Sequence, residues 1–199
     1  MTGEETAPSA RQAELLELAY RYVASRGRAE LSLRPLASAI GSSPRVLLYL
    51  FGSKDGLIRA LLARARADEL AVLGTAGGDN KTAPDGLGVV AARIWSWLAA
   101  DAHRGLLTLW INSYARSLAD PEGPWADFAA TTVADWLTVL GAAQEVSLRD
   151  TAAGLTERTL VLAVLRGALL DLLATGDVER TTASVRLQLT MLVPPDPPG

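Results

Sequence analysis

The sequence contains no cysteine and only one histidine, His103, among its 199 residues. The absence of cysteine excludes disulfides, thiolate metal sites and cysteine nucleophiles. A single histidine forms no Glu-x-x-His metal motif here, and a Ser/His/Asp triad would depend on His103 alone, with no strand-turn-helix elbow around any serine. No glycine-rich phosphate loop follows a strand pattern. We therefore expect no enzyme activity, no metal site and no cofactor.

Long hydrophobic runs are also missing. The most apolar stretch, residues 160–173, is interrupted by Arg166 and Asp171 and is short for a membrane span. The first nine residues include Glu4 and Glu5 and lack the apolar centre of a signal peptide. The expected protein is cytoplasmic and has no membrane partner.

Charge is distributed unevenly along the chain. Residues 1–66 carry ten Lys and Arg against six Asp and Glu, a net charge of +4, whereas the remainder carries −7. A basic N-terminal part on an acidic body suits contact between that part and a polyanion. Chance variation of the surface charge is the alternative explanation.

Hydrophobic residues make up 49% of the chain, with only two phenylalanines, which favours helices over sheets. No segment alternates with the period of two that a strand would show. We predict an all-α fold with an N-terminal three-helix head in residues 1–60 and a helical body in residues 61–199. Gly154 is expected to separate two body helices, residues 74–85 to form a loop and residues 194–199 a disordered or extended tail. The nine expected helices span about 14–25, 33–40, 44–51, 54–73, 86–101, 103–118, 125–143, 155–175 and 178–192.

Residues 33–51 have the parts of a helix-turn-helix. Apolar residues recur on one face of the first short helix, and Gly41 supplies the positive φ that a sharp turn needs. Ser43 can cap the second helix, and Pro44 follows at the first helical position, where a missing N–H costs nothing. A second helix this short suits docking in the major groove of DNA.

The stretch LSLRPLASAIGSSPRVLLYLFGSKDGL, residues 31–57, resembles the DNA-binding signature of the TetR (tetracycline-repressor-like) family of transcriptional regulators. That signature has S-hydrophobic-R-x-hydrophobic-A in the second helix, a glycine at the turn, S-x-x-x-L-Y-x-x-F in the third helix and then S-K-E-x-L. This chain departs from it at Leu48, where the family usually has tyrosine, although Tyr49 follows directly, and at Gly52, where the family usually has proline. The matching residues are Ser32, Arg34, Leu36, Ala37, Gly41, Ser43, Leu47, Phe51, Ser53, Lys54, Asp55 and Leu57.

The resemblance implies that residues 1–60 form a domain that binds double-stranded DNA. Arg45, near the start of the recognition helix, could donate two hydrogen bonds to a guanine edge, and Arg34 and Lys54 suit phosphate or base-edge contacts. Val46 could contact a thymine methyl group or pack in the core, and Tyr49 could replace the missing tyrosine contact if the helix rotates. The predicted DNA-binding residues are Arg34, Ser43, Pro44, Arg45, Val46, Tyr49 and Lys54.

The resemblance also implies that residues 61–199 bind a small-molecule effector and form a homodimer. All five tryptophans lie between residues 86 and 143, where polar residues interrupt apolar helices as they would in an effector pocket. The predicted effector-binding residues are Trp95, Trp110, Asn112, Arg116, Thr132 and Trp136. The last two long helices match the family's dimerisation bundle, for which we predict Leu160, Val164, Gly167, Ala168, Leu172, Leu187 and Met191.

The function implied is that of a homodimeric repressor that binds a palindromic operator and is released by a small apolar or amphipathic effector. Ligand bound between the body helices would shift the fourth helix and so change the separation of the two DNA-reading heads. Two alternatives stay open. The chain could be a helical interaction module that has the helix-turn-helix fold but does not bind DNA, or the helix at 155–175 could lie inside a monomer.

Overall fold

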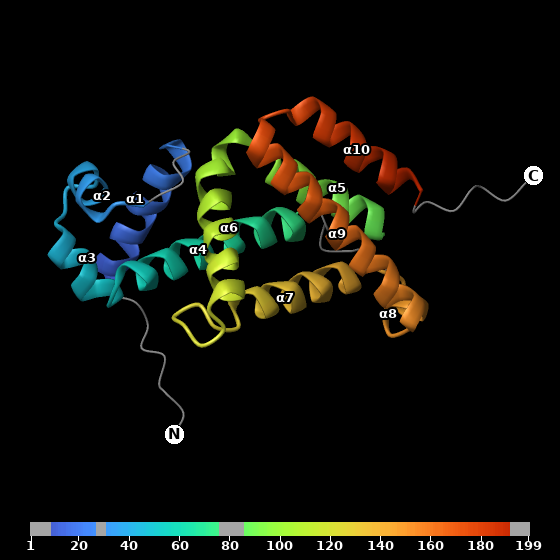
Figure 1. Cartoon of the computed structure of the whole chain (residues 1–199), viewed down its shortest axis with the longest axis horizontal. Coiled ribbons are helices and arrows are strands. Elements are labelled where there is room, and N and C mark those ends of the chain that lie inside the picture. Colours follow the sequence, from blue (N-terminus) through green and yellow to red (C-terminus); the bar gives the residue numbers. More distant parts are fainter. Residues whose placement is uncertain (1–8, 27–30, 76–85, 192–199) are drawn as a thin grey trace, which may run out of the picture.

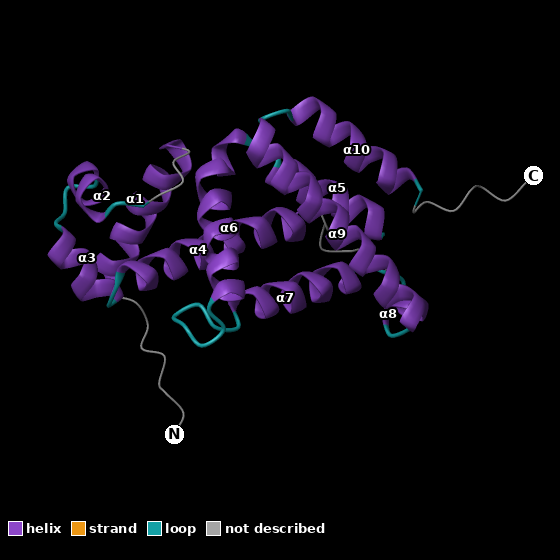
Figure 2. Cartoon of the chain, viewed as in Figure 1, coloured by secondary structure: helices purple, strands orange, loops and turns teal. Residues whose placement is uncertain are grey.

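The computed structural model describes residues 9–26, 31–75 and 86–191, and every regular element within these ranges is helical (Figures 1 and 2). The predicted tail, and most of the loop predicted at 74–85, lie outside the described residues. The helices are α1 (Ala10–Arg26), α2 (Leu33–Ala39), α3 (Pro44–Phe51), α4 (Lys54–Thr75), α5 (Leu87–Leu98), the 3₁₀ turn η1 (Asp101–His103), α6 (Arg104–Ala119), α7 (Phe128–Ala142), α8 (Val146–Arg149), α9 (Ala152–Thr175) and α10 (Val178–Thr190).

The helices form a head and a body that share α4 (Figure 1). In the head, α1 and α3 pack on α4, and α2 packs on α1 and α3. In the body, α5 and α6 pack on α4, α7 joins α6 to α9, and α10 covers α9 and α5. The buried residues of both parts belong to one continuous hydrophobic core. The boundary predicted at residue 60 therefore falls inside a single helix, α4.

The all-α prediction is confirmed, but three details of it are wrong. The short helix α8 was not predicted, and α7 begins at Phe128 rather than at residue 125, because residues 121–127 form turns and Asp127 has a φ of 62°. Gly154 does not separate two helices but lies in the first turn of α9. That helix begins early because the Thr151 hydroxyl accepts the Gly154 N–H at 3.0 Å. A Cβ on Gly154 would lie 2.1 Å from the Leu148 carbonyl oxygen, so glycine here permits the close approach of α8.

A polar cluster joins α1 to α4 beyond the apolar contacts. Arg64 on α4 pairs with Glu17 on α1 and with Asp68 one turn further along α4. The Tyr20 hydroxyl donates to Asp68 at 2.7 Å. Burial of the ring, together with this hydrogen bond to a carboxylate, raises the pKa of Tyr20 above its ordinary range. The head is thus fixed to the half of α4 that continues into the body.

None of the helices within the described ranges is long and apolar enough to cross a membrane.

Candidate nucleic-acid interface and interior cavity

The angle between α2 and α3 is set by a tight turn and a small apolar core. Gly41 has a φ of 65°, which residues with a Cβ adopt at a cost, and the Ser43 hydroxyl accepts the Val46 N–H at 3.3 Å to cap α3. Leu36 and Leu47 are buried on the facing sides of the two helices. These residues form the crossed pair that the sequence predicts.

A second glycine accounts for one departure from the family pattern. Gly52, between α3 and α4, has a φ of 74°. Proline fixes φ near −65° and could not occupy this backbone conformation. The chain therefore enters α4 by a different turn from the one that the usual proline would form.

The outer surface of α3 is mostly apolar and aromatic. Tyr49 is 85% exposed, Leu48 is 40% exposed and Val46 is 38% exposed. Arg45 is exposed and is the only charged residue of α3. Leu48, at the position where the family usually has tyrosine, thus faces solvent, and the phenol of Tyr49 protrudes beside it.

Cations and a cap flank this surface. Arg34 on α2 and Ser43 are exposed, Lys54 at the start of α4 is half-buried, and Pro44 is half-buried at the first position of α3. The structure places all seven residues predicted to bind DNA around the N-terminal ends of α2, α3 and α4 or on the outer side of α3. Their contact with DNA remains a prediction.

The beginning of α4 is held by an arginine from the body. Arg116 on α6 donates from Nη1 and Nη2 to the two oxygens of Asp55, at 2.7 and 3.0 Å. These hydrogen bonds hold the pKa of Asp55 below its ordinary value. The guanidinium groups of Arg116 and Arg59 also lie over the buried ring of Trp125, at 5.5 and 4.7 Å from its centroid. This group of residues, which we call the α4–α6 joint, links the helix after the recognition helix directly to the body.

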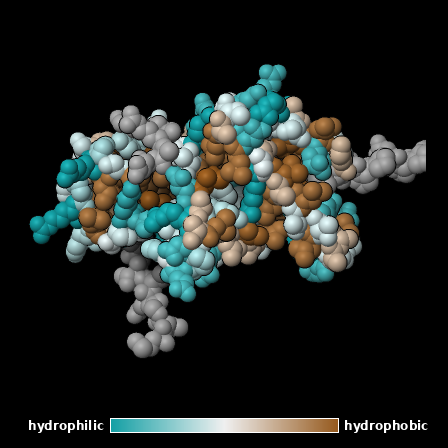
Figure 3. Space-filling view, viewed as in Figure 1, coloured by the Kyte–Doolittle hydropathy of each residue, from teal (hydrophilic) through white to brown (hydrophobic). Residues whose placement is uncertain are grey.

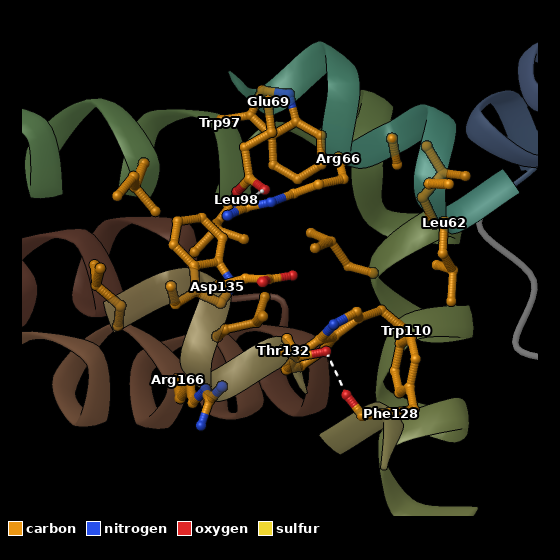
Figure 4. A pocket seen from close by; sticks show the side chains of 18 of the residues that line it. Leu62, Arg66, Glu69, Trp97, Leu98, Trp110, Phe128, Thr132, Asp135 and Arg166 are labelled. Atoms are coloured by element: carbon orange, nitrogen blue, oxygen red, sulfur yellow. Dashed lines mark hydrogen bonds and ion pairs between the residues drawn. The ribbon is translucent and has the colours of Figure 1, made fainter. Parts of the chain in front are cut away.

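A cavity of about 450 Å³ lies in the body, among α4, α5, α6, α7 and α9 (Figure 4). That volume is in the range of pockets that bind drug-sized molecules. Its wall is mostly apolar, with three tryptophans and one phenylalanine. Within the described residues, no group of three or more histidine, aspartate or glutamate side chains is placed to hold a metal ion. The residues lining the cavity are Arg59, Leu62, Ala63, Ala65, Arg66, Glu69, Ile94, Trp97, Leu98, Leu106, Leu107, Trp110, Phe128, Thr131, Thr132, Asp135, Trp136, Leu162, Leu165, Arg166 and Leu169.

A buried ion pair borders one side of this cavity. Glu69 on α4 is only 5% exposed and accepts from Arg66 at 2.9 Å through one carboxyl oxygen. The Arg66 guanidinium lies 4.2 Å from the ring centroid of Trp136. Burial raises the pKa of Glu69 to about 7, although the hydrogen bond from Arg66 opposes this shift. The second carboxyl oxygen of Glu69 has no hydrogen-bond partner within the part of the chain that the structure describes.

An arginine from α9 borders the cavity at another point. Arg166 lies against Tyr114, with its guanidinium 5.3 Å from the ring centroid and Nη1 3.4 Å from the hydroxyl. Its Nε and Nη2 atoms are buried, and neither has a hydrogen-bond partner among the described residues. In Figure 4, Arg166 and Glu69 appear on opposite sides of the cavity, with Asp135 between them.

Three of the six residues predicted to bind an effector line the cavity: Trp110, Thr132 and Trp136. The other three do not. Trp95 is buried against α10, where its Nε1 donates to Thr182 at 3.0 Å, Arg116 belongs to the α4–α6 joint, and Asn112 is exposed on α6. The sequence did not point to Glu69 or Arg66, because their helix has no marked apolar face. Arg166 could have been found from the sequence, because it is a charged residue within the most apolar stretch of the chain.

One side of α9 remains uncovered by the rest of the protomer. Val161, Leu165 and Leu169 face the core, whereas the exposed positions recur at helical spacing and are apolar or small. Figure 3 shows hydrophobic side chains gathered over α9 and its neighbours on the face in view. We call this exposed stripe the α9 outer face; it consists of Leu160, Ala163, Gly167, Leu170 and Ala174.

Six of the seven residues predicted for the dimer interface are at least partly exposed to solvent in the protomer. Leu160, Gly167, Leu187 and Met191 are exposed, and Val164 and Ala168 are half-buried. The prediction for Leu172 is wrong, because this side chain is 2% exposed within the core of the protomer. It lies on the inward side of α9, which apolarity alone could not distinguish from the outward side.

No protein-family model matches the chain, and no curated protein matches its sequence. Its fold, however, matches solved structures over nearly the whole chain. A proposed TetR-family transcriptional regulator from Rhodococcus sp. has a TM-score of 0.66 and 20% identity, over 92% of this chain and 99% of that one. The multidrug binding protein EbrR, solved with imidazole, has a TM-score of 0.59 and 23% identity, over 94% of this chain and 92% of that one.

A TetR-like transcriptional regulator from Rhodococcus sp. RHA1 also matches, with a TM-score of 0.56 and 19% identity, over 90% of this chain and 93% of that one. The chain therefore has the all-α, helix-turn-helix fold of TetR-family regulators. The resemblance of residues 31–57 to the family signature and the match of the whole fold agree.

Proposed function

We propose that this protein is a ligand-responsive transcriptional regulator that binds double-stranded DNA as a homodimer and acts as a repressor released by a small molecule. The observation that carries this proposal is the α2–α3 pair, which presents Arg34 and Arg45, with Lys54 close by at the start of α4. A short helix with an exposed N-terminal end fits the major groove, and cations on either side of it suit the flanking phosphates.

DNA binding is tested by fluorescence anisotropy with a labelled duplex from the region directly upstream of the protein's own gene. The affinity should fall steeply between about 50 and 200 mM salt, because bound phosphates release counterions. The double variant Arg34→Gln/Arg45→Gln should lose most of the binding. The matched control Arg93→Gln/Arg104→Gln removes the same charge from the body and should bind as the wild type does.

A second function is favoured by the apolar surface of α3. Leu48 and the protruding Tyr49 would suit a protein partner as well as a nucleic acid, since exposed apolar patches mark interaction surfaces. This is the interaction module without DNA binding. It predicts no salt-dependent anisotropy change with the upstream duplex and no difference between the two double variants.

The uncovered side of α9 supports the homodimer in this proposal. The α9 outer face is an apolar stripe with small residues at Ala163 and Gly167, and a Cβ at Gly167 would meet nothing within 4 Å. A second helix could approach closely there. A two-fold dimer would place two recognition helices on one side of DNA, about 34–36 Å apart on a palindromic operator.

Release by an effector follows from the position of α4. The residues Leu62, Arg66 and Glu69 of α4 line the cavity, and its first turn belongs to the head. Arg59 lines the cavity and also stacks on Trp125 in the α4–α6 joint. A ligand that displaces α4 would therefore move the recognition helix, and a coupling of about 1–3 kcal/mol is enough to regulate binding.

A further inference from the structure

Arg166 carries an unused pair of hydrogen-bond donors. The Nε–H and the Nη2–H lie on the same edge of the planar guanidinium and point in the same direction, and both nitrogens are buried without a partner. The third nitrogen, Nη1, has only a long contact of 3.4 Å with the Tyr114 hydroxyl. A buried charged edge of this kind is costly to leave unpaired.

The free edge of Arg166 has the geometry of a carboxylate-binding fork. Two parallel N–H groups on one guanidinium edge match the two oxygens of a carboxylate, which is the strongest pairing that arginine makes with an organic acid. No carboxylate of the described protein occupies this edge, although Arg166 lines the cavity.

The other charged groups of the cavity have different surroundings. Arg66 already pairs with Glu69 and stacks on Trp136, and Arg59 stacks on Trp125. Asp135 is exposed, so water screens its repulsion of an anion. Among the described residues that line the cavity, Arg166 is thus the cation that has buried donors without a hydrogen-bond partner.

The remainder of the cavity suits the body of a bifunctional organic acid. Trp97, Trp110 and Phe128 contribute aromatic walls. Glu69, on the side opposite Arg166 in Figure 4, has one buried carboxyl oxygen without a partner, which can accept a hydrogen bond from a hydroxyl group. A flat ring system with an acid at one end and a donor at the other would satisfy both ends.

We propose that the effector is a hydroxylated aromatic carboxylic acid, whose carboxylate binds the Nε–Nη2 edge of Arg166 and whose hydroxyl group donates to Glu69. This inference rests on the proposed function only in taking the cavity as the effector site. Its test uses the full-length protein without DNA, so a failure here is distinct from a failure of DNA binding.

The test is isothermal titration calorimetry with three sizes of probe: para-hydroxybenzoate, the corresponding hydroxynaphthoate and the corresponding hydroxybiphenyl carboxylate. Each is compared with its neutral amide and with the amine in which an aminomethyl group replaces the carboxylate. We expect at least one carboxylate to bind about 10- to 100-fold more tightly than its amide and amine, as expected for the loss of a charge-assisted pair. The absence of binding by all three carboxylates, or tighter binding by the amines, would overturn the proposal.

Two variants test which residue binds each end of the ligand. Arg166→Met should abolish the preference for carboxylate over amide, while thermal unfolding without ligand should occur at an equal or higher temperature, because an unpaired buried charge has been removed. Glu69→Gln should keep the carboxylate preference and reduce the gain in affinity from the hydroxyl group, measured by comparing each hydroxylated carboxylate with benzoate, naphthoate or biphenyl carboxylate, which lack that group. Retention of the carboxylate preference in a folded Arg166→Met protein would show that the acid binds elsewhere and contradict the proposal.

Discussion

The exposed side chains of α3 are Arg45, Val46, Leu48 and Tyr49, and they differ greatly in what they can contribute to DNA recognition. Arg45 is the one group of α3 that could distinguish base pairs by two hydrogen bonds. Lys54 at the start of α4 is a point charge suited to a phosphate. Removal of Arg45 and removal of Lys54 should therefore have different effects on DNA binding.

Arg45→Ala should reduce binding to the operator by about 1–3 kcal/mol and weaken the preference for operator over unrelated DNA. Lys54→Ala should weaken binding to both duplexes similarly and reduce the slope of log affinity against log salt by about one. Anisotropy titrations on the two duplexes at several salt concentrations measure both effects. Equal loss of sequence preference in the two variants would contradict these roles.

Glu69 predicts a pH dependence of stability. Its pKa is raised from 4.5 to about 7 by burial, so between these values the folded protein binds a proton that the unfolded chain releases. The stabilisation is complete below pH 4.5 and is lost as the pH rises through about 7. Wild-type stability should fall by about 1–3 kcal/mol more than that of Glu69→Gln between pH 5 and pH 8, as measured by urea unfolding. If the stability of the two proteins depended on pH in the same way, the raised pKa of Glu69 would be refuted.

At the scale of elements, the junctions decide the geometry more than the helices do. The α3–α4 junction depends on the positive φ of Gly52, and the start of α4 depends on the hydrogen bonds between Arg116 and Asp55. The α8–α9 junction depends on Gly154, which allows the Leu148 carbonyl to approach. These are single residues whose replacement changes how two helices meet.

Gly52→Ala should destabilise the protein by about 1–2 kcal/mol, because a residue with a Cβ is strained at this φ. Gly52→Pro, which installs the usual residue of the family, should be more harmful, because proline cannot reach a φ of 74°. The control is Gly88→Ala inside α5, where the nearest heavy atom to the new Cβ is 3.9 Å away. It should stabilise by about 0.5–1 kcal/mol. Thermal unfolding followed by circular dichroism compares the three, and a tolerated proline would contradict the argument.

At the scale of the whole molecule, the proposed repressor would pair two heads, and the α9 outer face is the surface proposed for pairing. Its apolar residues lie on the side of α9 away from the core, in the body and not in the head. The distance between the two heads would then depend on the bodies and on α4.

Leu160→Glu or Leu170→Glu should convert the proposed dimer to a monomer, because each variant places a carboxylate within the proposed interface. Loss of the dimer should also weaken operator binding, since a monomer contacts one half-site. Leu148→Glu on α8, also a partly exposed leucine, is the control and should remain dimeric. Sedimentation equilibrium measures the mass of each variant, and dimers of all three would place the interface elsewhere.

Much of this protein could be predicted from local residue order. The 3.6-residue spacing of leucine and alanine identifies most helices, and the turn residues Gly41, Ser43 and Pro44 identify the helix-turn-helix, because helix capping and backbone conformation depend on residues close together in the chain. The local sequence of residues 31–57 also carries the resemblance to the family signature. The prediction failed at the starts of two helices: Gly154 does not end a helix because Thr151 caps α9 three residues earlier, and α7 begins late because residues 121–127 form turns.

The cavity and the uncovered side of α9 required the tertiary structure. Leu172 and Leu170 are equally apolar in the sequence, yet one faces the core and the other faces solvent. Likewise, Glu69 and Arg166 are distant in the chain and border one cavity only because α4 and α9 pack around it. Apolar periodicity determines which residues form helices, whereas the packing of all helices together determines which side of each helix remains free and which charges are left without partners.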